Sequence, residues 1–112
     1  MKNLRILVVE DDSDVRRLIV QALGRSDHFA DGCGDAVTAL EHLRREEYDV
    51  LLTDLVMPGA SGLELLVEAR RDRPLLRCIV MSGHDRVEDA GREVVWLTKP
   101  IDLDALDAAL DM

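Results

Sequence analysis

Apolar residues along this chain gather in four short runs that alternate with amphipathic stretches. The runs occupy residues 6–9, 50–52, 78–81 and 94–97. Each is rich in Val, Ile and Leu and nearly free of polar residues, which is typical of strands buried on both faces of a parallel sheet. Regular alternation also predicts a strand within residues 28–33, although Asp31 and Gly32 weaken its apolar pattern.

The stretches between the runs show the spacing of amphipathic helices. In the clearest one, a single helical face carries Val15, Leu18, Ile19, Ala22 and Leu23. We expect Gly24 to end this helix. Weaker repeats predict helices that begin after Asp35, Ser61 and Asp102, whose side chains can accept hydrogen bonds from the first helical amides. Residues 85–91 fit only a very short helix.

Strands that alternate with helices of these lengths predict an α/β fold. Right-handed crossovers favour a doubly wound, five-stranded parallel sheet of order 2-1-3-4-5, a flavodoxin-like three-layer sandwich. The 112 residues are enough for one domain, residues 1–112. A net charge of −9 argues against nucleic acid and anionic membranes as partners. We also expect a cytoplasmic protein with reduced Cys33 and Cys78, because no secretion signal or membrane span is recognisable.

Polar residues that can do chemistry follow the four apolar runs. They are Glu10, Asp11 and Asp12 after the first run, Asp54 after the second, Ser82 after the third and Lys99 after the fourth. The carboxyl ends of parallel strands meet at one edge, where ligands of such sheets bind. Clustered carboxylates without His or Cys favour a hard cation such as Mg²⁺. A carboxylate beside Mg²⁺ can attack phosphorus, and Lys99 and Ser82 can donate to phosphoryl oxygens.

Four motifs carry a resemblance to a known family. They are EDD at 10–12, DLVMPG at 54–59, MSG at 81–83 and KP at 99–100. In this order, and each at a strand end, they resemble the CheY-like receiver domain of bacterial two-component response regulators. The resemblance extends from Leu4 to about Leu110.

The resemblance implies a phosphorylation site with a metal ion. Asp54 would be the phosphoacceptor and a metal ligand. Asp11 would bind Mg²⁺ directly, Glu10 would act mainly through water, and the backbone carbonyl of Val56 would be a further ligand. Asp12 or Ser13 is needed as the helix cap and is left out of the site.

Three further roles are implied by the same resemblance. Lys99 would pair with the phosphoryl group and Ser82 would be the switch hydroxyl. Trp96, three residues before Lys99, occupies the position of the switch aromatic, although a fixed core or surface anchor fits it nearly as well. His84 fits the rim of the pocket. The short spacing from Ser82 to Lys99 predicts a shortened fourth helix, as in some receivers attached to hybrid histidine kinases.

The expected function is therefore phosphoacceptance in a phosphorelay, not enzymatic turnover. A histidine kinase or histidine phosphotransfer protein would donate to Asp54, and phosphorylation would change a surface that binds a downstream protein. The chain has no room for a DNA-binding output domain. A phosphohydrolase is disfavoured because Val56 stands where such enzymes carry a second Asp. An interaction module independent of phosphorylation is the other alternative, but it predicts losses among the site residues, and none is lost.

Overall fold

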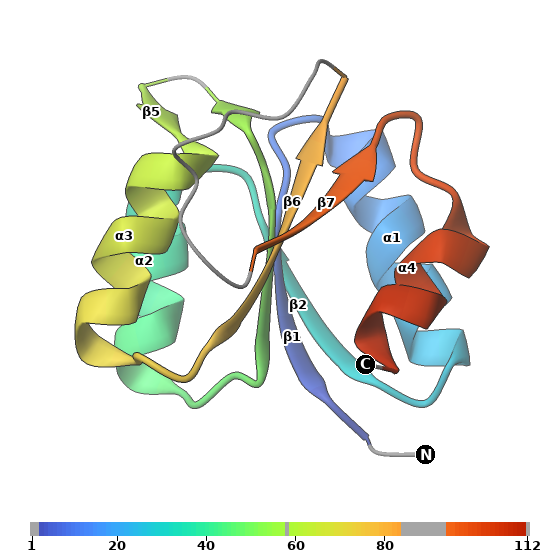
Figure 1. The fold of residues 1–112 in the computed structure, drawn as a ribbon, viewed down its shortest axis with the longest axis horizontal. Coiled ribbons are helices and arrows are strands. Elements are labelled where there is room, and N and C mark those ends of the chain that lie inside the picture. The colour runs from blue at the N-terminus through green and yellow to red at the C-terminus, as the bar shows by residue number, and fades with distance from the viewer. Residues whose placement is uncertain (1–2, 58, 84–93, 112) are drawn as a thin grey trace.

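A five-stranded parallel sheet forms the centre of the protein in a computed structural model, which describes residues 3–57, 59–83 and 94–111. Its strands are β1 (Arg5–Val9), β2 (Phe29–Cys33), β3 (Val50–Asp54), β6 (Arg77–Ser82) and β7 (Val94–Thr98). They lie in the order β2-β1-β3-β6-β7, and every neighbouring pair is parallel (Figure 1). Counted along the chain, this is the predicted order 2-1-3-4-5, so the doubly wound α/β fold is confirmed.

Within the described part of the chain, four helices complete a three-layer arrangement. They are α1 (Ser13–Arg25), α2 (Ala36–Arg45), α3 (Gly62–Asp72) and α4 (Leu103–Leu110). Helices α2 and α3 cover one face of the sheet, and α1 and α4 cover the other (Figure 1). Among the described residues, no helix combines the length and apolar character that a membrane span requires. The short helix predicted over residues 85–91, and His84, lie outside the described residues.

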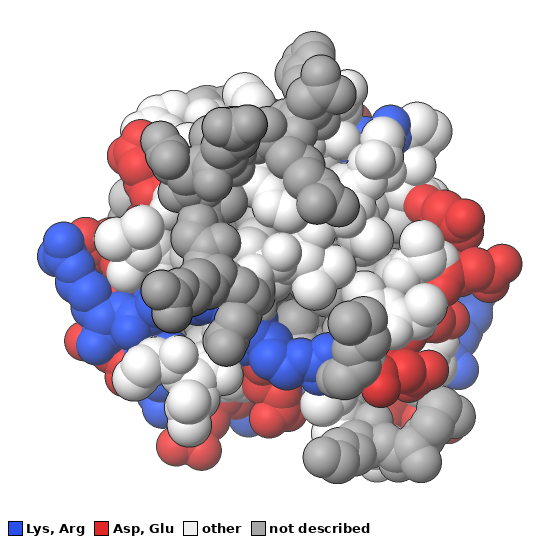
Figure 2. Space-filling model, viewed as in Figure 1, with Lys and Arg blue, Asp and Glu red and all other residues white. Residues whose placement is uncertain are grey.

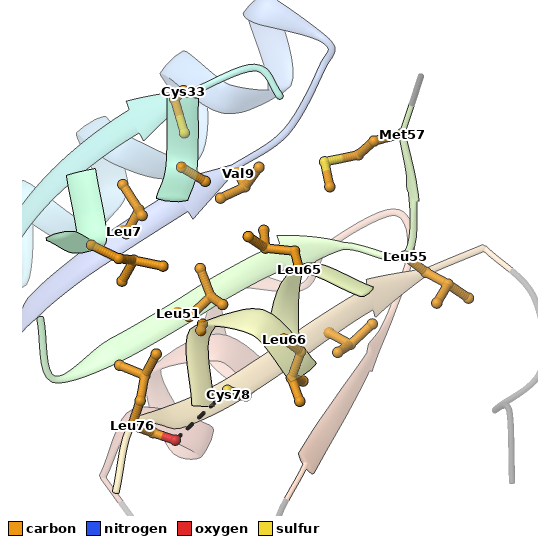
Figure 3. Packing of buried hydrophobic residues seen from close by; sticks show 14 residues of the cluster. Leu7, Val9, Cys33, Leu51, Leu55, Met57, Leu65, Leu66, Leu76 and Cys78 are labelled. Carbon is orange, nitrogen blue, oxygen red and sulfur yellow. Dashed lines mark hydrogen bonds between the residues drawn. The ribbon is translucent and has the colours of Figure 1, made fainter. Parts of the chain in front are cut away.

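Alternation along the buried strands divides the core in two. Leu7 and Val9 face α2 and α3, whereas Ile6 and Val8 of the same strand face α1 and α4. Figure 3 shows the first of these clusters, in which residues of three neighbouring strands meet α3; its labelled members include Leu7, Val9, Leu51, Cys78, Leu65 and Leu66. Because these strands are covered on both faces, their sequences are almost continuously apolar.

Helix starts were predicted more accurately than helix ends. The N-caps are Asp12, Asp35, Ser61 and Asp102, and each side chain accepts from a backbone amide of its first turn. The predicted stop at Gly24 is wrong, because α1 continues to Arg25. The left-handed residue that reverses the chain is Asp27, with φ 66°. Aspartate adopts this conformation more readily than most residues because its short side chain can bond locally.

Near the carboxyl edge of the sheet, the observed strands differ from the predicted ones in two ways. Strands β3, β6 and β7 extend to the polar residues Asp54, Ser82 and Thr98, because backbone pairing continues past the last apolar side chain. A small antiparallel hairpin of β4 (Val56–Met57) and β5 (Ala60–Ser61) was not predicted. It lies directly after Asp54 and leads into α3.

Candidate functional site

Lys99 joins two of the predicted acidic residues at the carboxyl edge of the sheet. Its Nζ donates to Glu10 Oε1 at 2.6 Å and to Asp54 Oδ2 at 2.9 Å. Glu10 follows β1, Asp54 is the last residue of β3, and Lys99 follows β7. The Lys99 amide also donates to the Ser82 carbonyl at 2.8 Å, which fixes the lysine backbone beside the end of β6. The fold therefore brings together residues that are up to 89 positions apart.

The two carboxylates that pair with Lys99 are buried. Glu10 is 1% exposed and Asp54 is 7% exposed, so neither carboxylate is well hydrated. A buried carboxylate needs a charged or hydrogen-bonding partner to be tolerated. Burial lowers the pKa of Lys99, but its hydrogen bonds to Glu10 and Asp54 outweigh burial, and the net result is a raised pKa. The ammonium group is therefore firmly protonated at neutral pH.

Three carboxylates at this edge could hold a metal ion. One oxygen from each of Glu10, Asp11 and Asp54 lies within 4.8 Å of the others. A hydrogen bond with Glu10, and then burial and the Glu10 charge, raise the pKa of Asp11. The site thus holds more negative charge than Lys99 neutralises. An all-oxygen cluster with excess negative charge fits Mg²⁺.

We expect Asp11→Asn to stabilise the metal-free protein and to remove its response to Mg²⁺. The raised pKa of Asp11 contributes stability only below its ordinary value of 3.8, and this contribution is lost as the pH rises through the raised pKa. At neutral pH the charged Asp11 therefore destabilises the fold slightly. Bound Mg²⁺ should stabilise the wild type by about 2.7 kcal/mol at one hundred times its Kd. Urea unfolding with Mg²⁺ or with EDTA measures both effects.

The matched control is Asp104→Asn, which removes an exposed carboxylate in the first turn of α4. It should keep the full response to Mg²⁺. Affinity for Mg²⁺ should also fall as the pH is lowered through the raised pKa of Asp11, because the metal must displace a proton. An Asp11→Asn protein that Mg²⁺ stabilises as much as the wild type would refute this assignment.

The other predicted site residues lie at the same edge or close to it. Ser82 is buried at the end of β6 and pairs in register with Thr98. Trp96 is half-buried and packs against the apolar cluster on the α2 and α3 side of the sheet. Val56 begins the hairpin directly after the Asp54 strand, and its side chain is largely exposed. The roles assigned to these three residues remain predictions.

Gly62 holds the segment after Asp54 close to the sheet. Its amide donates to the Leu55 carbonyl at 2.7 Å, and the Leu55 amide donates to the Met81 carbonyl at 2.8 Å. A Cβ atom at position 62 would clash with the Asp54 carbonyl oxygen. Since that neighbour is backbone, it cannot move aside without displacing Asp54 itself. Glycine is therefore required here for the carboxylate to keep its place.

Gly62→Ala should therefore disturb both the fold and the position of Asp54. We expect a loss of about 2 kcal/mol in the free energy of unfolding, within the range for overpacking. Gly24→Ala is the control, because a Cβ there meets nothing within 4 Å and should be neutral or stabilising by up to about 1 kcal/mol. Urea denaturation compares the two. Equal stability of both variants would mean that the close approach at Gly62 is not as described.

A second group of possible ligands was missed by the sequence analysis. Oxygen and nitrogen atoms of Asp31, His42 and Glu46 lie within 4.8 Å of one another. The Tyr48 hydroxyl lies 2.6 Å from Asp31 Oδ2 and 3.2 Å from Glu46 Oε2. The Arg5 guanidinium lies 3.8 Å and 3.2 Å from the same two carboxylates. The Arg5 guanidinium pairs with both carboxylates and the Tyr48 hydroxyl lies within hydrogen-bond distance of them. We therefore interpret the cluster as a surface contact that links β1, β2 and the end of α2.

Comparison with known sequences gives consistent matches. A sequence model of the response regulator receiver domain matches residues 6–111. The chain is 36% identical over 104 residues to the response regulator receiver protein CpdR of Brucella abortus, covering 88% of this chain and 87% of that protein. It is 34% identical over 116 residues to the DNA-binding transcriptional regulator NtrC of Azospirillum brasilense, covering 99% of this chain and 24% of NtrC. The chain thus spans most of one relative and about a quarter of the other.

Solved structures share the fold over almost the whole chain. The receiver domain of the hybrid histidine kinase CckA is 29% identical, with a TM-score of 0.85 over 96% of this chain and 95% of that domain. The response regulator TrrA of Thermotoga maritima, solved in complex with Mg(2+)-BeF, is 26% identical, with a TM-score of 0.89 over 96% of each chain. Chemotaxis regulator CheY4 of Vibrio cholerae, at 20% identity, shows the fold alone, with a TM-score of 0.88 over 98% of each chain.

Proposed function

Because this chain belongs to the response regulator receiver domain family of two-component signalling, we propose that it accepts a phosphoryl group on Asp54. The donor would be a phosphohistidine on a histidine kinase or histidine phosphotransfer protein. The observation that carries the proposal is the bridge from Lys99 Nζ to Asp54 Oδ2 and Glu10 Oε1, beside a cluster of three carboxylates. The resemblance of the motifs at 10–12 and 54–59 to those of the family supports the same residues.

The transfer itself needs no external base. An Asp54 carboxylate oxygen attacks phosphorus, the P–N bond to the imidazole of the donor breaks, and its electron pair returns to that ring. Lys99 lies 2.9 Å from Asp54 and can pair with the phosphoryl oxygens as they arrive. Its second bond, to Glu10, keeps the ammonium in place meanwhile. The buried Ser82 hydroxyl, at the same edge, is the second proposed donor.

Glu10, Asp11, Asp54 and the Val56 carbonyl are the proposed Mg²⁺ ligands. Bound Mg²⁺ would neutralise carboxylate charge and phosphoryl charge at once. The similarity to TrrA, whose structure contains Mg(2+)-BeF, supports Mg²⁺ as the ion. The close approach of three carboxylate oxygens, one each from Glu10, Asp11 and Asp54, supports it from this chain's own residues. Asp11, the exposed member of the cluster, can reach an ion that enters from solvent.

The product would act by changing a protein-binding surface. The pairing of β6 with β7 joins Ser82 and Trp96 to the site, so a shift of the Ser82 segment toward the phosphoryl group can be passed to Trp96. A protein partner also agrees with the charge of the molecule. The net charge is −9, and Figure 2 shows acidic side chains gathered on the side of α4. Such a surface does not favour nucleic acid.

Intact-protein mass spectrometry after incubation with phosphoramidate tests the proposal. We expect one added phosphoryl group with Mg²⁺ and none with EDTA. A phosphohydrolase would instead hydrolyse p-nitrophenyl phosphate continuously, which Val56 in place of a second Asp argues against. Absence of any adduct in a folded, Mg²⁺-loaded sample, with no hydrolysis of the donor, would favour an interaction module that is independent of phosphorylation.

A further inference from the structure

The side chain of Arg16 lies across the end of β2. Its guanidinium Nη1 donates to the backbone carbonyl of Glu10 at 2.8 Å. The arginine belongs to the second turn of α1, whereas Glu10 is the residue at which the chain leaves β1. The side chain therefore ties the helix back to the point where the acidic segment begins.

Two glycines leave room for this side chain. A Cβ atom at Gly32 would lie 3.0 Å from Arg16 Cγ and 3.1 Å from Cδ, and one at Gly34 would lie 2.9 Å from Nη1. The aliphatic stem thus passes over Gly32, and the guanidinium passes over Gly34. Gly32, one of the two residues that weaken the apolar pattern of β2, and Gly34, just after that strand, therefore leave the space that the Arg16 side chain occupies.

The backbone of Glu10 is consequently held from both sides. Its amide donates to the Cys33 carbonyl at 3.0 Å, and its carbonyl accepts from Arg16. Because the amide and the carbonyl of Glu10 are both hydrogen-bonded, the direction in which the chain leaves β1 is fixed. That direction brings the Asp11 carboxylate within reach of Asp54 and Glu10.

Resting on the proposed function, we propose that Arg16 is a positioning residue for the metal site, acting through the Glu10 carbonyl. Because the arginine donates to the backbone carbonyl of Glu10, it acts on Asp11 by placing the backbone that leads to it. Residues that orient metal ligands in this way typically change metal affinity by 10- to 100-fold when they are removed. We expect Arg16→Met, which keeps most of the stem but removes the donor, to weaken Mg²⁺ binding about tenfold.

Gly34→Ala is the second variant, and it leaves the arginine in the protein. Its methyl group would lie 2.9 Å from the flexible end of Arg16, whereas the Glu10 carbonyl oxygen is 3.9 Å away, an ordinary van der Waals distance. The guanidinium can therefore move aside at little cost to folding. We expect the same weakening of Mg²⁺ binding as in Arg16→Met. Because both changes break one hydrogen bond, the double variant should bind Mg²⁺ about as well as either single variant. Arg16→Lys, which retains a donor, should recover part of the affinity.

Two controls separate this role from charge and from general destabilisation. Arg17→Met removes the same charge from the exposed neighbouring position on α1, and Gly24→Ala adds a methyl group where nothing lies within 4 Å. Both should bind Mg²⁺ as the wild type does. Calorimetric titration with Mg²⁺ alone gives the affinities, and urea unfolding in EDTA gives the stability of each metal-free variant.

The outcomes distinguish this proposal from the proposed function. Weakened binding in Arg16→Met and Gly34→Ala, with unchanged controls, supports the positioning role. Wild-type affinity in Gly34→Ala overturns that role even if Arg16→Met fails to fold. If the wild type and both variants bind Mg²⁺ equally well, the positioning role is overturned but the proposed function is not. A wild type that does not bind Mg²⁺ at all overturns both proposals.

Discussion

Asp54→Asn should abolish phosphoryl incorporation while leaving the protein folded. The amide has nearly the same shape as the carboxylate but is not a nucleophile toward phosphorus at neutral pH. Lys99 keeps its shorter bond, at 2.6 Å to Glu10, so the buried charges remain paired. We expect incorporation from phosphoramidate to fall by at least about 100-fold, the effect of removing an essential catalytic group. Intact-protein mass measures it directly.

The control for this prediction is Asp72→Asn, which removes an exposed carboxylate at the end of α3. It should incorporate one phosphoryl group at the wild-type rate. Circular dichroism and urea unfolding establish that Asp54→Asn is folded. Unchanged labelling of the folded Asp54→Asn protein would show that another residue accepts the phosphoryl group.

Lys99→Met should have the largest effect on stability of any single change in the site. It leaves the Glu10 carboxylate, 1% exposed, without its charged partner, and it removes the partner of Asp54 as well. Breaking a buried ion pair by removing one member costs about 3 kcal/mol or more. Phosphorylation should also slow by about 100-fold, as when one preorganised donor is removed from a reacting centre.

The pH dependence of this loss has a definite sign. The raised pKa of Lys99 means that its contribution to stability is complete below the ordinary value for lysine and is lost as the pH rises through the raised value. The wild type and Lys99→Met should therefore differ fully at neutral pH and converge only above about pH 10.4. Stability from urea unfolding at a series of pH values measures the difference.

Arg44→Met removes an exposed cation from α2 and is the control for Lys99→Met. Its stability should stay within about 0.5 kcal/mol of the wild type. Adding Glu10→Gln to Lys99→Met should restore part of the lost stability, because it removes the unpaired charge. Equal stability of Lys99→Met and the wild type at pH 7 would mean that water or another group already pairs with Glu10.

The site was predictable because it depends on topology more than on side-chain packing. Parallel strands end at one edge, so the residues after each apolar run had to meet there, and Glu10, Asp54 and Lys99 do. The helix starts were predictable for a similar reason, since a single side chain such as Asp12 makes each cap.

What the sequence could not predict depends on contacts between distant segments. Nothing in the local pattern shows that Arg16 reaches the Glu10 carbonyl or that Gly62 approaches the Asp54 carbonyl. The β4 and β5 hairpin was missed because two-residue strands have no readable periodicity. The end of α1 was misplaced because Asp27, and not Gly24, adopts the left-handed conformation.

Chemical trapping tests the central claim most directly. Borohydride reduces an aspartyl phosphate to homoserine, and peptide mass spectrometry then identifies the residue that was modified. After incubation with phosphoramidate and Mg²⁺, we predict homoserine at position 54 and at no other aspartate, and none when EDTA replaces Mg²⁺. Homoserine at another aspartate, or a phosphoryl adduct that borohydride does not convert, would contradict the assignment of Asp54 as the phosphoacceptor.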